Sequence, residues 1–172
     1  YVENQGIIET SLVVKDGKIF AIGGEHEVEE YCAVKENWIV VPGFIDQHIH
    51  GAMGSDAMDG TTKDIYNIAT AIAKEGTVGF LPTTMTQSVE NICTALKAIK
   101  EYVEEEHTEG AKVFGVHLEG PYISPDFIGA QPLEYVQKPS VESFRKYEEA
   151  SGNTIKIVSL APEQPGSDEL IE

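Results

Sequence analysis

The sequence has few basic residues. Only 12 Lys and Arg stand against 29 Asp and Glu, which gives a formal net charge of −17 over 172 residues. Nucleic acids and anionic membranes bind proteins through broad basic patches, because both are polyanions. We therefore expect neither a nucleic acid nor a membrane as a partner of this chain.

Cysteines and long apolar runs are also scarce. Cys32 and Cys93 are far apart and form no Cys-x-x-Cys pair, which argues against a disulfide framework and a thiolate zinc site. No apolar stretch approaches the roughly 20 residues needed to cross a bilayer. The first residues include Glu3 and no basic segment, unlike a signal peptide. These features predict a protein of the reducing cytoplasm.

Two histidines follow a short apolar run. The run 38–41 ends at Pro42-Gly43 and predicts a strand buried on both faces, as in a parallel sheet. His48 and His50 come next, and their i, i+2 spacing puts both side chains on one face of an extended strand. Two imidazoles on one face can hold one metal ion, so the pair favours a metallohydrolase.

A second apolar segment carries a carboxylate. Residues 112–121 are interpreted as one buried strand with His117 and Glu119 on the same face. The carboxyl ends of parallel strands meet at one rim, where active sites lie, so Glu119 is expected to reach a metal held by His48 and His50. His117 lies one step deeper and is expected to support the site or fill the core rather than bind metal.

Other polar residues fit more than one role. Asp46 shares the face of the histidine pair and either supports the site or bonds backbone groups. His26 and His107 lie among glutamates and are expected at the solvated surface. The loop 51–56 is expected to be flexible, without the spacing of a phosphate-binding glycine loop. Three threonines either line the rim or cap a helix: Thr83, Thr84 and Thr86.

The rest of the pattern alternates strands with helices after an initial hairpin. The hairpin is predicted over 11–22, where Asp16-Gly17 suits a tight type I′ turn. Helices are expected over about 64–75, 88–103, 140–150 and 168–172, and further strands over 78–81 and 155–160. The inward stripe of the second helix is Ile92, Leu96, Ile99 and Val103.

Repeated strand–helix units predict an α/β fold with parallel strands. Two architectures fit: an open sheet, or the first half of a (β/α)8 TIM-type barrel, which the metal motif favours. A complete barrel needs about 250 residues, so in the second case the chain is truncated. We expect residues 1–41 to form a small β segment and residues 42–172 the first half of the barrel.

The motifs together resemble one family. Segments 41–51, 81–84 and 117–122 occur in the order seen in the N-acetylglucosamine-6-phosphate deacetylases of the amidohydrolase superfamily. The resemblance implies a (β/α)8 barrel, a small β-sandwich built from both chain ends, and a homodimer. It also implies metal-dependent hydrolysis of the N-acetyl amide of an amino-sugar phosphate, N-acetylglucosamine 6-phosphate, to glucosamine 6-phosphate and acetate.

The resemblance also assigns metal ligands. Glu119 matches the metal-binding glutamate of the family, and His48 and His50 match members that can hold a second metal. One or two divalent ions are therefore expected, zinc or iron first, with manganese or cobalt as possible substitutes. The remaining metal histidines, the catalytic aspartate and most phosphate contacts are expected beyond Glu172.

One loop departs from the family pattern. Members often have Gly-Ala-His where this chain has Gly129-Ala130-Gln131. By the resemblance, Ala130 and Gln131 are expected to bind substrate. Gln131 can donate and accept hydrogen bonds but cannot titrate near neutral pH, so its contact would position the substrate rather than move a proton.

Two alternatives stay open. The first is another amidohydrolase-superfamily enzyme, such as a cyclic amidase or an aminoacylase, many of which use a carboxylated lysine on the fourth strand. Here Lys156 falls near the start of that strand, away from the rim, which weakens this alternative. The second is a non-enzyme: an inactive, truncated half-barrel that serves as a binding module and exposes an unpaired sheet edge.

Overall fold

The computed structural model describes residues 1–30, 32 and 38–172, which form two compact units, Tyr1–Pro42 and Gly43–Glu172. In the first unit β1 (Leu12–Lys15) and β2 (Lys18–Ile22) pair antiparallel. Between them Asp16 and Gly17 have φ of 52° and 69°, the two positive values that a type I′ turn requires. The predicted hairpin is confirmed.

The apolar run before the histidines is not the strand that the sequence predicted. Residues 38–41 have no regular secondary structure and are all at least half exposed. The strand starts later, as β3 (Phe44–Ile49), where the Phe44 amide donates to the Gly76 carbonyl at 3.0 Å. The preceding Pro42 has no N–H to donate to a ladder, so pairing begins after it.

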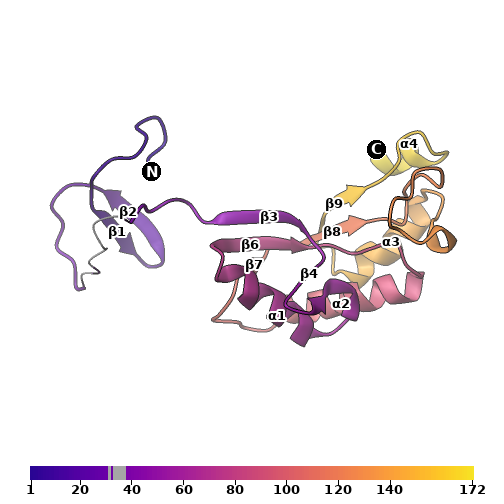
Figure 1. Cartoon of the computed structure of the whole chain (residues 1–172), viewed down its shortest axis with the longest axis horizontal. Helices are drawn as coiled ribbons and strands as arrows, with labels where there is room; N and C mark the ends of the chain where they lie inside the picture. The colour runs from indigo at the N-terminus through magenta and orange to yellow at the C-terminus, as the bar shows by residue number, and fades with distance from the viewer. Residues whose placement is uncertain (31, 33–37) are drawn as a thin grey trace. The chain divides into compact units, whose positions relative to one another are not determined.

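The second unit alternates parallel strands with helices (Figure 1). Its further elements are α1 (Thr62–Ala73), β6 (Thr77–Pro82), α2 (Val89–Glu104), β7 (Lys112–Val113), β8 (Val116–Glu119), α3 (Val141–Ala150), β9 (Ile155–Ser159) and α4 (Ser167–Ile171). Strand β6 pairs parallel with β3 and β7, and β8 pairs parallel with β9. The fold is mixed α/β, and the predicted helices and the strands near 78–81 and 155–160 are confirmed.

Residues 112–121 form two strands, not the single strand that was predicted. Strand β7 pairs with β6, whereas β8 pairs with β9, so the chain changes its neighbouring strand between Val113 and Val116. The Phe114 amide donates to the Phe80 carbonyl, and the Val116 amide donates to the Thr154 carbonyl. A parallel bridge between Thr83 and His117 continues the order from β6 to β8.

Helices α1 and α2 cover one face of strands β3 and β6 (Figure 1). Their inward residues are fully buried: Ile65, Ile68, Ile92, Leu96 and Ile99. The stripe of α2 ends at Tyr102, which is 3% exposed, and not at Val103, which is 45% exposed. Both positions follow Ile99 at helical spacing, and the structure buries Tyr102, whose ring also packs face to face on His107.

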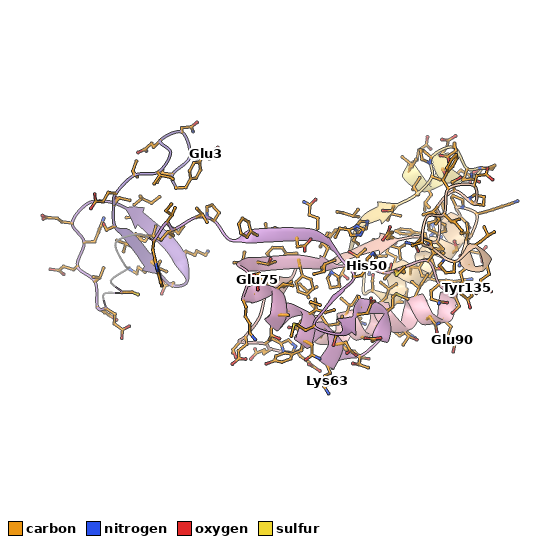
Figure 2. All side chains as sticks on the ribbon, in the orientation of Figure 1. Glu3, His50, Lys63, Glu75, Glu90 and Tyr135 are labelled. Carbon is orange, nitrogen blue, oxygen red and sulfur yellow. The ribbon has the colours of Figure 1, made fainter. Side chains whose placement is uncertain are left out.

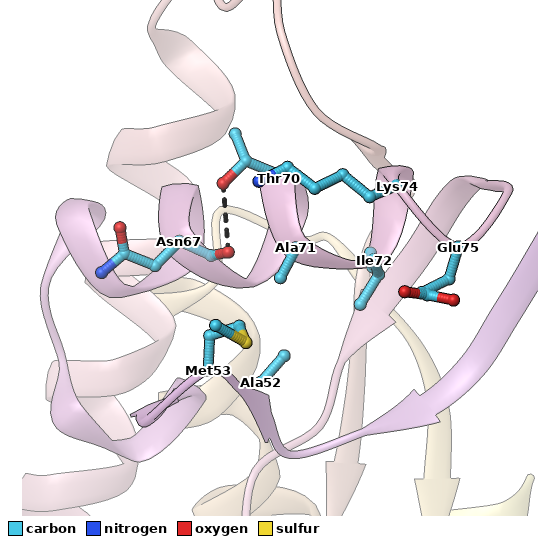
Figure 3. A pocket seen from close by; sticks show the side chains of 8 residues that line it. All are labelled: Ala52, Met53, Asn67, Thr70, Ala71, Ile72, Lys74 and Glu75. Atoms are coloured by element: carbon cyan, nitrogen blue, oxygen red, sulfur yellow. Dashed lines mark hydrogen bonds between the residues drawn. The ribbon is translucent and has the colours of Figure 1, made fainter.

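The loop after the histidines is a tight hairpin rather than the flexible loop that was expected. Strands β4 (Gly51–Ala52) and β5 (Ser55–Asp56) pair around Met53 and Gly54, both of which have positive φ. A short 3-10 helix, η1 (Ala57–Asp59), follows. The hairpin and α1 border an open pocket (Figure 3), beside which Thr70 donates to the Asn67 carbonyl at 3.1 Å. The residues around this pocket include none of the three predicted metal ligands.

No helix among the described residues has both the length and the apolar character needed to span a membrane.

Candidate metal centre

The three predicted ligands lie together at the carboxyl ends of two strands. His48 lies in β3, His50 directly follows that strand (Figure 2), and Glu119 is the last residue of β8. The Glu119 Oε2 atom is 3.0 Å from His50 Nε2 and 3.6 Å from His48 Nε2. One ligand atom from each residue lies within 4.8 Å of the other two. Two imidazole nitrogens and a carboxylate oxygen therefore share one small volume.

The Glu119 carboxylate is placed as a metal ligand would be. Its Oε2 atom is buried and accepts no hydrogen bond from any described residue. A buried carboxylate oxygen that accepts no hydrogen bond is costly, because it has lost its bonds to water. A cation held between this oxygen and the two imidazoles would offset that cost. Divalent metals such as zinc take this donor set, so the residues present fit such an ion.

The tautomer of His50 supports the same interpretation. The His50 Nδ1 atom is 3.1 Å from the Thr83 carbonyl oxygen. A carbonyl can only accept, so Nδ1 carries a proton, and in the neutral ring Nε2 would keep a lone pair that faces Glu119. Metal-binding histidines are typically oriented by such a bond from their second nitrogen.

Thr83 also fixes the backbone between the two histidines. Its hydroxyl accepts from the Ile49 amide at 3.0 Å, and its own amide donates to the Ile49 carbonyl at 2.9 Å. The residue is fully buried. It therefore neither lines an open rim nor caps a helix, and the cap of α2 is Ser88. The sequence suggested both roles but not this one.

His117 is a core histidine with both nitrogens in use. Nδ1 donates to the Gln47 carbonyl at 3.0 Å, and Nε2 accepts from the Ser159 hydroxyl at 2.9 Å. Burial lowers the pKa of His117 and so favours the neutral ring. In this arrangement it offers no lone pair to a metal, and it joins β8 to β3 and β9 beside the His48 ring.

Asp46 bonds the backbone of His48. Its Oδ1 atom accepts from the His48 amide at 3.0 Å, so of the two roles considered for it, the structure shows the bond to a backbone group. Ala130 is exposed. Lys156 is exposed at the second position of β9, before the Ser159 that pairs with Glu119.

Gln131 makes a contact that the sequence gave no sign of. Its Oε1 atom accepts from the Thr86 amide at 2.7 Å, across 45 residues of chain. Thr86 is buried, and its hydroxyl has no partner among the described residues. The neighbouring Thr84 hydroxyl lies 3.5 Å from the Glu119 carbonyl. No local signal in the sequence predicts a side-chain bond between two loops.

The two histidines expected at the surface, His26 and His107, are both exposed. His26 is exposed, as predicted. His107 stacks on Tyr102 with ring centres 3.9 Å apart, and its Nε2 atom is 3.0 Å from the Tyr102 carbonyl. His107 is also an exposed residue, as predicted, although only 22% of its side chain is exposed. Tyr102, five residues earlier in the chain, supplies a surface on which the imidazole packs.

This chain is similar to known proteins in sequence and in structure. The model of the Amidohydrolase family matches residues 39–170. N-acetylglucosamine-6-phosphate deacetylase of Bacillus subtilis (strain 168) is 40% identical over 174 residues, which cover 98% of this chain and 44% of that protein. N-acetylgalactosamine-6-phosphate deacetylase of Escherichia coli O157:H7 is 33% identical over 156 residues, which cover 91% of this chain and 40% of that protein.

A solved structure agrees with these matches. The crystal structure of N-acetylglucosamine-6-phosphate deacetylase from Thermotoga maritima aligns with a TM-score of 0.75 at 29% identity, over 93% of this chain and 40% of that chain. This chain therefore spans less than half the length of each of these relatives. The family match covers most of the sequence, and the chain belongs to the amidohydrolase family.

Proposed function

We propose that the full-length protein hydrolyses the N-acetyl amide of N-acetylglucosamine 6-phosphate and releases glucosamine 6-phosphate and acetate. The observation that carries this proposal is the buried Glu119 oxygen, which accepts no hydrogen bond from the described residues and faces two imidazoles at the strand ends. Relatives at up to 40% identity are named for this reaction. The same geometry makes His48, His50 and Glu119 the proposed metal ligands.

The ligand set suits hydrolysis of an amide. A bound divalent metal acts as a Lewis acid on the amide carbonyl and lowers the pKa of water from 15.7 toward about 7. Two neutral imidazoles and one carboxylate leave a net positive charge at the site. Hydrolysis puts the water oxygen on the acetyl carbon and a proton on the sugar nitrogen as the C–N bond breaks. The family resemblance assigns that proton transfer to an aspartate beyond Glu172.

The metal is proposed to be zinc or iron, as one or two ions, because histidine and carboxylate ligands suit both. Manganese or cobalt would bind the same donors.

Ala130 and Gln131 are proposed as substrate contacts on the strength of their place in the β8–α3 loop. With a net charge of −17, the chain has no general attraction for a phosphorylated sugar. Cationic groups for the phosphate are therefore expected at specific positions.

A second candidate substrate is the galactosamine epimer, since one relative is named for N-acetylgalactosamine 6-phosphate. The chemistry at the amide is the same for both sugars. Only the contacts to the hydroxyl that differs between them would separate the two.

The larger architecture and setting are also proposals. Strands β3, β6, β8 and β9 follow one another in parallel and would be the first four of a (β/α)8 barrel, within residues 42–172. Residues 1–41, with one hairpin, would contribute to a small β-sandwich. A homodimer and a cytoplasmic location stay predictions from the resemblance and the composition.

The test is acetate release by the full-length protein from both amino-sugar phosphates, before and after chelation and after metal is restored. Glu119→Gln should remove metal-dependent release, because an amide is a poor metal ligand. Glu101→Gln, on the exposed face of α2, is the matched control and should leave release unchanged. A folded, metal-loaded protein that releases no acetate would point to another substrate, such as a cyclic amide or an acylated amino acid. Absence of both metal and activity would favour the non-enzyme.

A further inference from the structure

Two loops at the carboxyl ends of the strands are joined by one side chain. Gln131 lies in the loop between β8 and α3, and its Oε1 atom accepts from the Thr86 amide in the loop between β6 and α2, at 2.7 Å. This bond fixes the orientation of the carboxamide, because only the oxygen can accept. The Nε2 group is not buried and has no partner among the described residues.

Thr86 in turn packs against the residue that follows Glu119. Gly120 has φ of 67°, and a Cβ atom there would overlap the Thr86 hydroxyl and crowd its backbone. Only glycine combines this conformation with so close an approach. The same segment also contacts β8 directly, since the Thr84 amide donates to the His117 carbonyl at 3.0 Å and the Thr84 hydroxyl lies 3.5 Å from the Glu119 carbonyl.

We propose that Gln131 is a positioning residue for the metal centre, and that it acts through Thr86 and Gly120 on the Glu119 carboxylate. This inference rests on the proposed metal site and adds a role for Gln131 beyond substrate contact. The Gln131 bond holds the backbone of Thr86 against Gly120. With Thr86 fixed there, the end of β8 keeps the Glu119 oxygen directed toward the two imidazoles.

The chemistry of the bond supplies matched variants. Gln131→Glu keeps an oxygen that can accept from the Thr86 amide but removes the NH2 donors. Gln131→Leu has a similar size and removes both. Gln137→Leu is the control for general damage to this loop, because Gln137 accepts from the Tyr147 hydroxyl and not from Thr86. The four full-length proteins, wild type included, are stripped of metal and titrated with Co²⁺, and both the dissociation constant and the visible Co²⁺ spectrum are recorded.

The positioning role predicts that Gln131→Leu weakens Co²⁺ binding about tenfold, the lower end for residues that orient metal ligands from outside the ligand set. Its Co²⁺ spectrum should also change. Gln131→Glu should bind Co²⁺ no more weakly than wild type, and Gln137→Leu should match wild type. Any change in KM for the sugar phosphate in Gln131→Glu, with Co²⁺ binding retained, would show the NH2 group contacting substrate in addition.

The proposal is overturned if Gln131→Leu binds Co²⁺ with the wild-type constant and spectrum, even when its KM rises. It is also overturned if Gln137→Leu weakens binding equally, because the effect would then be general loop damage. A wild-type protein that binds no Co²⁺ would overturn the metal centre itself, and this inference with it. The first two results leave the proposed function standing.

Discussion

Replacing Thr83 with valine tests how the metal ligands are held in place. The substitution keeps the shape of a fully buried side chain and exchanges a hydroxyl for a methyl group. The lost hydroxyl accepts from the Ile49 amide at 3.0 Å and donates to the Leu81 carbonyl at 3.1 Å. Ile49 lies between the two histidines, so its amide would lose this partner at the centre of the proposed site.

The expected cost follows from the desolvation of that amide. An unsatisfied buried donor costs about 1–3 kcal/mol, and the new methyl group returns little, because the site is already packed. The free energy of unfolding of the metal-free protein should therefore fall by about 1–3 kcal/mol. Metal affinity should fall as well, since the backbone that carries both imidazoles is less firmly held.

The assay is urea unfolding of the metal-free, full-length protein, with Thr70→Val as the matched control. The Thr70 hydroxyl donates to carbonyls of its own helix, at Tyr66 and Asn67. Its loss should change the free energy of unfolding by no more than about 0.5 kcal/mol. Equal destabilisation by the two substitutions would refute the role given to Thr83.

Three further changes test other parts of the account. Leu96→Ala should lower the free energy of unfolding by about 2–5 kcal/mol, whereas Val103→Ala, on the exposed side of α2, should cost far less; similar losses in urea unfolding would contradict the observed burial. Burial raises the pKa of Tyr122 to about 12, whereas the pKa of a tyrosine in the unfolded chain is near 10. Between these two pH values the unfolded chain releases the proton and the folded chain keeps it. The free energy of unfolding should therefore fall between pH 10 and 12, and it should fall less steeply in Tyr122→Phe. Lys156→Met should leave the bound metal per chain unchanged, and loss of metal would restore the carboxylated-lysine alternative.

Local signals in the sequence predicted most elements correctly. Helices α1, α2 and α3 begin after Thr61, Ser88 and Ser140, each of which caps its helix with a side-chain oxygen. The hairpin followed from Asp16-Gly17. In each case the residues that determine the structure lie within a few positions of one another, so periodicity and capping are sufficient to find it.

The incorrect predictions concern elements whose bounds depend on residues far away in the sequence. The run 38–41 is as apolar as a buried strand, but pairing starts only at Phe44. Strand β8 pairs with β9 and does not continue β7 beside β6. None of these partners is visible in a local window of sequence.

At the candidate site, too, some features were predicted from the sequence and others were not. The i, i+2 spacing of His48 and His50 and the strand-end position of Glu119 were enough to predict that the three side chains meet, because parallel strands place their carboxyl ends at one edge. The supporting bonds of Thr83 and Gln131 were not predicted. They depend on loop conformations that follow from packing and not from spacing.

The central claim is that His48, His50 and Glu119 together bind a divalent metal. The most direct test measures the metal retained per chain by the full-length wild type, His50→Gln and Glu119→Gln after equal dialysis, with folding checked by circular dichroism. The account predicts that the wild type keeps its metal and that each variant folds but retains less. Wild-type metal content in both folded variants would contradict it.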